Sequence, residues 1–129
     1  MVTTTAAPVP ETKPHTLIPS DRVEGTAVRR PDGKKLGSIQ RLMIDKASGN
    51  VAYAVLKFGG ILGLGEKHYP VPWPMLKYNT TLEAYEMALT EEDLNCAPSF
   101  GLGEDFDWGD RAREAALHDY YRARPYWGI

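Results

Sequence analysis

The stretch from Val51 to Trp73 constrains the fold of this chain more than any other. Residues 51–58 (VAYAVLKF) carry apolar side chains on both faces of an extended strand, and only Lys57 interrupts the run. A glycine-rich segment, Gly-Gly-Ile-Leu-Gly-Leu-Gly, follows and leads into a second extended run at residues 67–71. This order predicts a β-hairpin whose first strand is central in a sheet and whose tip carries aliphatic side chains.

The second strand of the hairpin contains two prolines. Pro70 and Pro72 have no amide hydrogen to donate to a neighbouring strand, so this strand is expected at an edge or bonded on one side only. The next residues, Trp73 to Leu76, predict a single helical or irregular turn that covers one end of the sheet with bulky side chains.

Two shorter strands precede the hairpin. Residues 26–30 form the first, and it ends at the turn Pro31–Lys34, where proline presets φ and glycine supplies a positive φ. Residues 35–45 form the second, but their apolar side chains change phase near Gln40 and Arg41. One extra residue restores the alternation, so we expect a β-bulge there.

The segment after the hairpin predicts a turn, a strand and a short helix. Residues 77–81 are expected to turn the chain, and residues 84–89 alternate between apolar and polar side chains as a closing strand does. Thr90 is followed by acidic residues, which suit the positive end of a helix dipole. Only one or two helical turns fit before Pro98.

Together these elements indicate a mostly β fold: a small, strongly bent antiparallel β-barrel with short helical turns and a C-terminal α-helical extension. A chain of 129 residues is long enough for one domain with a real core. We expect a flexible arm at residues 1–16, the barrel at residues 17–100, and an extension at residues 101–129.

The extension predicts one helix with an aromatic end. Asp110 can cap a helix over residues 111–122, and Pro125 stops it. Glu114 and His118 are expected to form a minor surface pair. Four residues at spacings of three and four share one stripe of this helix: Ala116, Leu117, Tyr120 and Tyr121.

Several segments in order resemble the PRC-barrel domain, which the cytoplasmic part of the photosynthetic reaction-centre H subunit shares with a ribosome maturation factor. They are residues 32–39 (DGKKLGSI), 42–45 (LMID), 49–56 (GNVAYAVL), 58–67 (FGGILGLGEK), 69–73 (YPVPW) and 89–94 (LTEEDL). The resemblance covers residues 17–100. It implies a small, bent antiparallel barrel that acts in protein assembly and has no known catalytic centre.

Composition and spacing argue against several other functions. The net charge of −2 gives no electrostatic footprint for nucleic acid, and the glycine-rich loop opens into a strand rather than the helix that phosphate loops need. The acidic run from Glu104 to Asp110 fails the calcium-loop pattern, so it is interpreted as a solvated, helix-capping cluster.

The histidines and the cysteine suggest structural roles. His15, His68 and His118 lack the short spacings of metal sites, and His68 is interpreted as a half-exposed strand residue. Cys96 has no base beside it and is expected to be a buried structural thiol. We therefore expect no metal, no cofactor and no catalytic residue.

The location expected from the sequence is the cytoplasm. A lone cysteine favours a reducing compartment, the N-terminus lacks the pattern of a signal peptide, and no apolar run approaches the ~20 residues of a spanning helix.

These observations favour a non-enzymatic interaction module, expected to be a homodimer with an unidentified protein partner. The alternatives are a barrel that binds a small ligand or RNA, and an enzyme with an unrecognised site. The predicted contact residues lie in the glycine loop, the helical turn and the extension: Gly60, Ile61, Leu62, Leu64, Trp73, Leu117, Tyr120, Tyr121, Tyr126 and Trp127.

Overall fold

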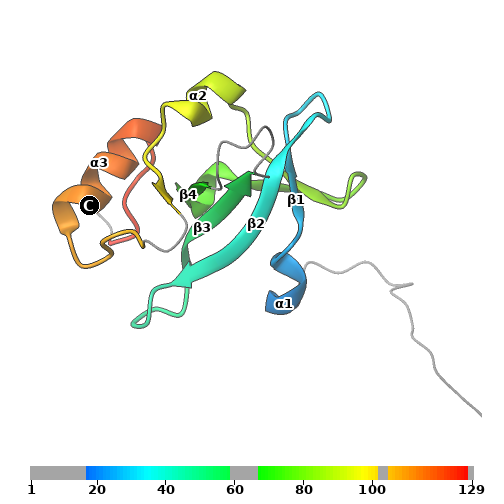
Figure 1. The fold of residues 1–129 in the computed structure, drawn as a ribbon. Coiled ribbons are helices and arrows are strands. Elements are labelled where there is room, and N and C mark those ends of the chain that lie inside the picture. The colour runs from blue at the N-terminus through cyan, green and yellow to red at the C-terminus, as the bar shows by residue number, and fades with distance from the viewer. Residues whose placement is uncertain (1–16, 59–66, 102–104, 128–129) are drawn as a thin grey trace, which may run out of the picture.

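The computed structural model describes residues 17–58, 67–101 and 105–127, which form one sheet with short helices around it (Figure 1). The elements in chain order are α1 (Ser20–Val23), β1 (Ala27–Arg29), β2 (Lys35–Ile44), β3 (Val51–Phe58), β4 (Lys67–Pro72), the 3-10 turn η3 (Trp73–Met75), β5 (Lys77–Asn79), β6 (Ala84–Glu86), α2 (Glu91–Asn95), β7 (Phe100–Gly101) and α3 (Arg111–Tyr121). The prediction of a mostly β fold with a C-terminal helix is confirmed.

The seven strands follow the order β5-β6-β1-β2-β3-β4-β7. Among the described strands the hydrogen-bonded pairs run along this line without closing a ring, so the sheet is open at β5 and β7. Figure 1 shows β2 curving alongside β3. The expectation of purely antiparallel pairing is wrong at one place, where β1 and β6 run parallel. Strand β6 therefore pairs antiparallel with β5 on one side and parallel with β1 on the other.

The predicted bulge in β2 is confirmed. Ile39 lies opposite Leu56 of β3, but the next pair joins Arg41 to Val55, so Gln40 is the extra residue. The bulge resets the alternation of the strand, and Ile39 is buried in the core.

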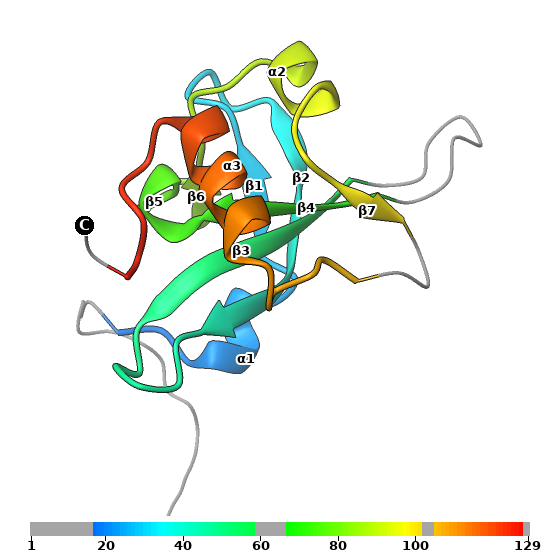
Figure 2. The same cartoon turned by 90° about the vertical axis from the view of Figure 1, so that its left-hand side faces the viewer.

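Strand β3 is central, as predicted, because it pairs with β2 on one side and β4 on the other. All side chains from Ala52 to Leu56 are buried, so both faces of the strand are covered. Figure 2 shows α3 lying across β3 and β4, and α3 contacts β4. The helix therefore covers one face of the strand that forms the centre of the sheet.

The prolines of β4 have the consequence expected from the sequence. Pro70 lies opposite Val55 and Pro72 opposite Tyr53, whereas β7 pairs only with Lys67 and His68. In the proline segment, therefore, the strand pairs on one side only. Prolines at alternate positions place both missing amides on the same edge of the strand.

One predicted turn is wrong. Residues 77–79 form strand β5, and the turn follows at residues 80–83, where Glu83 has a left-handed backbone with a φ of 52°. Asn79 stabilises this later turn, since its side-chain oxygen accepts from the amide of Leu82 at 2.9 Å and its side-chain nitrogen donates to Glu86 at 2.6 Å. The predicted turn at Gly33 is confirmed by its φ of 94°.

The cap of α2 is a complete capping box. The hydroxyl of Thr90 accepts from the amide of Asp93 at 3.0 Å, and the carboxylate of Asp93 accepts from the amide of Thr90 at 3.1 Å. Cys96 follows this helix and is exposed, so the prediction of a buried thiol is wrong. The helix ends there and leaves the side chain facing away from the core.

His68 is also placed differently from the expectation. It is buried and packs against the ring of Phe100, with 5.3 Å between the ring centroids. The sequence predicted a half-exposed residue because it did not predict β7, the two-residue strand that pairs with β4 at this position.

Truncation of a central core side chain tests the role of β3. Leu56 has no exposed surface, so Leu56→Ala is expected to lower the free energy of unfolding by about 2–5 kcal/mol. Leu82 is 41% exposed, and Leu82→Ala is expected to change it by less than about 0.5 kcal/mol. Urea denaturation of both variants measures the difference, and equal losses would contradict a core centred on β3.

Candidate functional site

Helix α3 begins and ends with local signals in its own sequence. The carboxylate of Asp110 accepts from the amides of Ala112 at 3.0 Å and Arg113 at 3.3 Å, as predicted for the cap. The helix ends before Pro125, because Arg122 adopts a left-handed conformation with a φ of 54°. The amide of Ala123 then donates to the carbonyl of His118 at 2.9 Å.

The buried face of α3 is partly apolar and partly polar. Leu117 and Tyr121 are buried as the predicted stripe requires, but Ala116 and Tyr120 are exposed. The other buried residues of the helix are Glu114 and His118, which are 3% and 2% exposed. The expectation that these two form a surface pair is therefore wrong.

A tyrosine of the central strand hydrogen-bonds to both buried polar side chains. The hydroxyl of Tyr53 donates to Oε1 of Glu114 at 2.8 Å and lies 2.8 Å from Nε2 of His118. A hydroxyl has one proton, so Nε2 of His118 must carry the proton it donates to Tyr53. The result is a chain of two hydrogen bonds from α3 to β3 and back to α3.

Burial shifts the proton affinities of this network. Burial lowers the pKa of His118 below its usual 6.5, although nearby carbonyls at Ala123 and Arg124 and the carboxylate of Glu114 favour the charged form. Burial and the hydrogen bond to Glu114 raise the pKa of Tyr53. The imidazole is therefore neutral at pH 7, and its Nδ1 has no hydrogen-bond partner within the described residues.

Aromatic side chains enclose the network. The ring of Tyr53 lies 5.3 Å from Trp108 and 5.6 Å from Tyr126, and the ring of His118 lies 5.3 Å from Trp127. The guanidinium of Arg111 stacks over Trp127 at 3.9 Å. We call this set the C-terminal cluster: Tyr53, Trp108, Arg111, Glu114, His118, Tyr126 and Trp127.

Two hollows border α3. A small cavity of about 160 Å³ lies beside the C-terminal cluster and is lined by Asp45, Ser48, Asn50, Val51, Ala52, Pro74, His118, Arg124 and Tyr126. A larger one of about 350 Å³, here called the α2–α3 groove, is lined by Met75, Leu89, Asp93, Tyr120, Tyr121 and Arg122. Within the residues that the structure describes, no group of three or more His, Cys, Asp or Glu side chains could hold a metal ion.

The structure brings together some of the predicted contact residues. Tyr120 and Tyr121 both line the groove, and Tyr126 and Trp127 both belong to the C-terminal cluster. Leu117 faces the sheet of its own chain. The predicted loop residues Gly60, Ile61, Leu62 and Leu64 lie outside the described residues.

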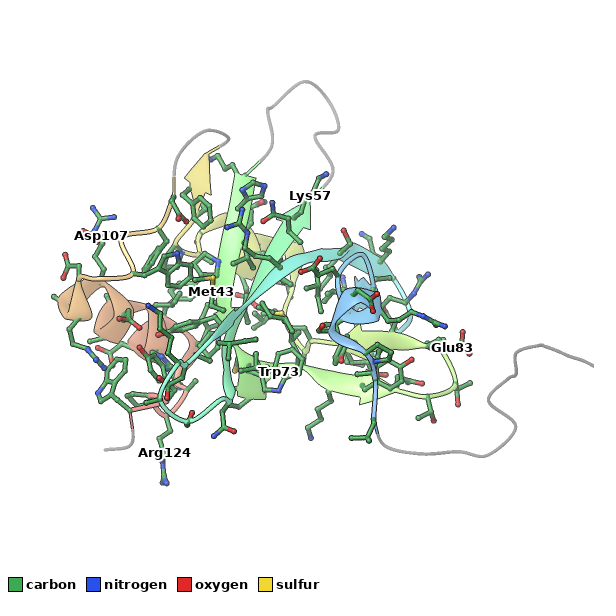
Figure 3. The ribbon with its side chains drawn as sticks, turned by 90° about the horizontal axis from the view of Figure 1, so that it is seen from below. Met43, Lys57, Trp73, Glu83, Asp107 and Arg124 are labelled. Carbon is green, nitrogen blue, oxygen red and sulfur yellow. The ribbon has the colours of Figure 1, made fainter. Side chains whose placement is uncertain are left out.

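Trp73 lies apart from the extension. It is half-buried on η3 and packs against Tyr85 of β6, with 5.4 Å between the ring centroids. Figure 3 shows Trp73 between the sheet strands, whereas Arg124 points away from the body of the chain. Trp73 lines neither of the two hollows, although its neighbours Pro74 and Met75 line one each.

The sequence interpretation missed five residues of the cluster: Tyr53, Trp108, Arg111, Glu114 and His118. A signal for two of them was present, because residues 114, 117, 118 and 121 follow the spacing of one helix face. Charged and titratable residues on that face suggested exposure, and Tyr53, 61 residues before Glu114, could not be identified as their partner.

The fold and the site define a class of protein: a small, mostly β domain whose C-terminal helix packs back onto the central strands. No described helix is long and apolar enough to cross a membrane. A family model, the PRC-barrel domain, matches residues 15–94, and the chain belongs to this family. The match ends within α2, so the extension lies beyond it. No curated protein sequence matches the chain.

Removal of one hydroxyl tests the hydrogen-bond network. Tyr53→Phe leaves two buried polar groups without their partner and is expected to lower the free energy of unfolding by about 1–3 kcal/mol. Tyr78 is exposed, and Tyr78→Phe is the matched control with an expected change of less than about 0.5 kcal/mol. Chemical denaturation measures both, and a Tyr53→Phe variant as stable as its control would contradict the network.

Proposed function

We propose that this chain is a non-catalytic protein-interaction and assembly module that forms a homodimer. Membership of the PRC-barrel domain family supports the general role, because that domain is a non-catalytic interaction module. The observation that carries the proposal for this chain is the α2–α3 groove, a hollow with both polar and apolar lining residues and an exposed tyrosine on its wall.

The chemistry of the groove suits a protein partner. Its lining residues include Met75, two tyrosines and Arg122, and methionine, tyrosine and arginine are enriched at protein–protein interfaces. Tyr120 is 40% exposed, and its hydroxyl donates to the backbone carbonyl of Asp93. This hydrogen bond holds the ring in place, so little side-chain entropy is lost when a partner covers it.

Opposite charges at the groove support a second copy as the partner. Asp93 comes from α2 and Arg122 from the end of α3, and both line the same hollow. In a two-fold symmetric interface a residue of one subunit meets a different residue of the other, and the reverse contact also forms. The groove can therefore pair Asp93 of each subunit with Arg122 of the other while the apolar walls are covered.

The remaining contact residues extend this proposal. The aliphatic glycine loop, with Gly60, Ile61, Leu62 and Leu64, supplies a further apolar surface that a partner would cover. Trp73, Tyr126 and Trp127 retain partial exposure and are further contact residues in the assembly we propose. Leu117 and Tyr121 contribute indirectly, since they hold α3 on the sheet.

The alternative of a small-ligand module has one supporting observation. The small cavity beside His118 mixes polar and apolar lining residues, and Nδ1 of His118 is without a partner among the described residues. A ligand there would be small, because a volume of about 160 Å³ corresponds to about five molecules of liquid water.

A groove variant tests the homodimer. Sedimentation velocity over a wide range of protein concentration is expected to show a monomer–dimer equilibrium for the unaltered chain. Tyr120→Ala removes the exposed anchor and is expected to weaken dimerisation by about 2 kcal/mol, or about 30-fold.

The control for this experiment is Tyr78→Ala, which removes an equally exposed tyrosine on β5, outside the groove lining. Circular dichroism checks that both variants remain folded. A monomer at every concentration, or equal effects of the two substitutions, would contradict the proposed interface.

A further inference from the structure

The contact between α3 and the sheet contains a titratable group where an apolar side chain would suffice. Leu117 and Tyr121 bury apolar surface on either side of His118, which is 2% exposed. His118 does not fill space alone, because its Nε2 donates to Tyr53, and Tyr53 in turn donates to Glu114. In the neutral imidazole this leaves Nδ1 as the bare nitrogen, and Nδ1 is buried without a hydrogen-bond partner among the described residues. A proton added at Nδ1 would therefore place a charge and an unpaired N–H group in a buried site.

Several charged and titratable groups face His118 from the elements around it. They are Glu114 and Asp119 on α3, Tyr53 on β3, Arg124 and Tyr126 in the tail, Asp45 across the small cavity, and Arg111 over Trp127. The two carboxylates of α3 favour the imidazolium. Burial disfavours it more strongly, so the pKa of His118 in the folded chain is lowered.

A route for the proton is also present. His118 lines the small cavity together with Asp45, which is half-buried, and with Ser48 and Arg124, which are exposed. A proton can therefore reach the ring from this side without opening of the sheet core. The cavity lies at the meeting point of the turn between β2 and β3 with residues that follow α3.

We propose that packing of the C-terminal extension, residues 105–127, onto the sheet is a pH-sensitive contact in which protonation of His118 loosens α3. The loosened state exposes Leu117 and Tyr121 together with the face of β3 around Tyr53. The contact is thus a switch that acid opens.

The direction and range of the effect follow from linkage. The pKa of His118 is lower when α3 is packed than its usual 6.5 when the helix is released, so the released state binds the proton more tightly. The stabilisation is complete above pH 6.5 and is lost as pH falls from 6.5 through the lowered pKa. One proton changes the packing equilibrium by at most about tenfold per pH unit in this range.

The test uses the full chain. Hydrogen-exchange protection factors, corrected for intrinsic exchange, are measured for the amides of α3 and of β3 between about pH 7.5 and about pH 5. Protection of α3 is expected to fall with pH by up to about tenfold per unit while that of β3 falls less. The titration of His118 is followed by NMR in the same samples and is expected below 6.5.

His118→Gln separates this switch from general acid sensitivity. A glutamine amide can still donate to Tyr53 but does not titrate, so the pH dependence of α3 protection is expected to disappear. His68→Gln is the matched control, since His68 is also buried but packs on Phe100, and it is expected to retain the dependence. The readout is the slope against pH, so it remains informative if either substitution lowers stability.

Glu114→Gln provides a second variant. The carboxylate of Glu114 favours the charged imidazole, so its loss is expected to move the His118 titration and the opening of α3 to lower pH. Titration of His118 at or above 6.5, constant protection of α3 across the range, or an unchanged slope in His118→Gln would each overturn the proposal.

Discussion

The hydroxyl of Tyr53 is the group on which the arrangement of the C-terminal half depends. Glu114 and His118 lie on the buried face of α3, where an unpaired polar group costs about 1–3 kcal/mol. Tyr53 pairs with both at 2.8 Å, and it can do so only because it lies on the central strand, under the helix. The aromatic rings of Trp108 and Tyr126 pack against the ring of Tyr53 and help to bury this bond chain, which strengthens it.

The extension also covers apolar surface that the β-domain would expose by itself. The family match ends at residue 94, yet β3 is apolar on both faces, and β4 lacks amide donors at Pro70 and Pro72. A domain that ended there would expose a face of its central strands, and exposed apolar faces favour association. In this chain α3 covers that face, so the extension takes the place of a partner while the α2–α3 groove remains available.

Local signals in the sequence predicted the elements that depend on neighbouring residues. The bulge at Gln40 was predicted because the alternation of apolar side chains changes phase there. The cap at Thr90 was predicted because threonine is a favoured residue at the start of a helix. Features that depend on distant pairing were missed: β5 and β7 are only three and two residues long, and their partners define them as strands. Glu114 and His118 were placed at the surface for the same reason, since Tyr53 lies far away in sequence.

The two faces of α3 link the groove to the C-terminal cluster. Tyr120 and Arg122 contribute to the groove, whereas His118 on the opposite face contacts Tyr53, and Tyr121 touches both the groove and the core. The groove therefore has its shape only while α3 is packed on the sheet. A partner that binds the groove stabilises the packed state, and by reciprocity it must lower the proton affinity of His118. By the same reciprocity, protonation of His118 weakens binding at the α2–α3 groove, on the other side of the helix.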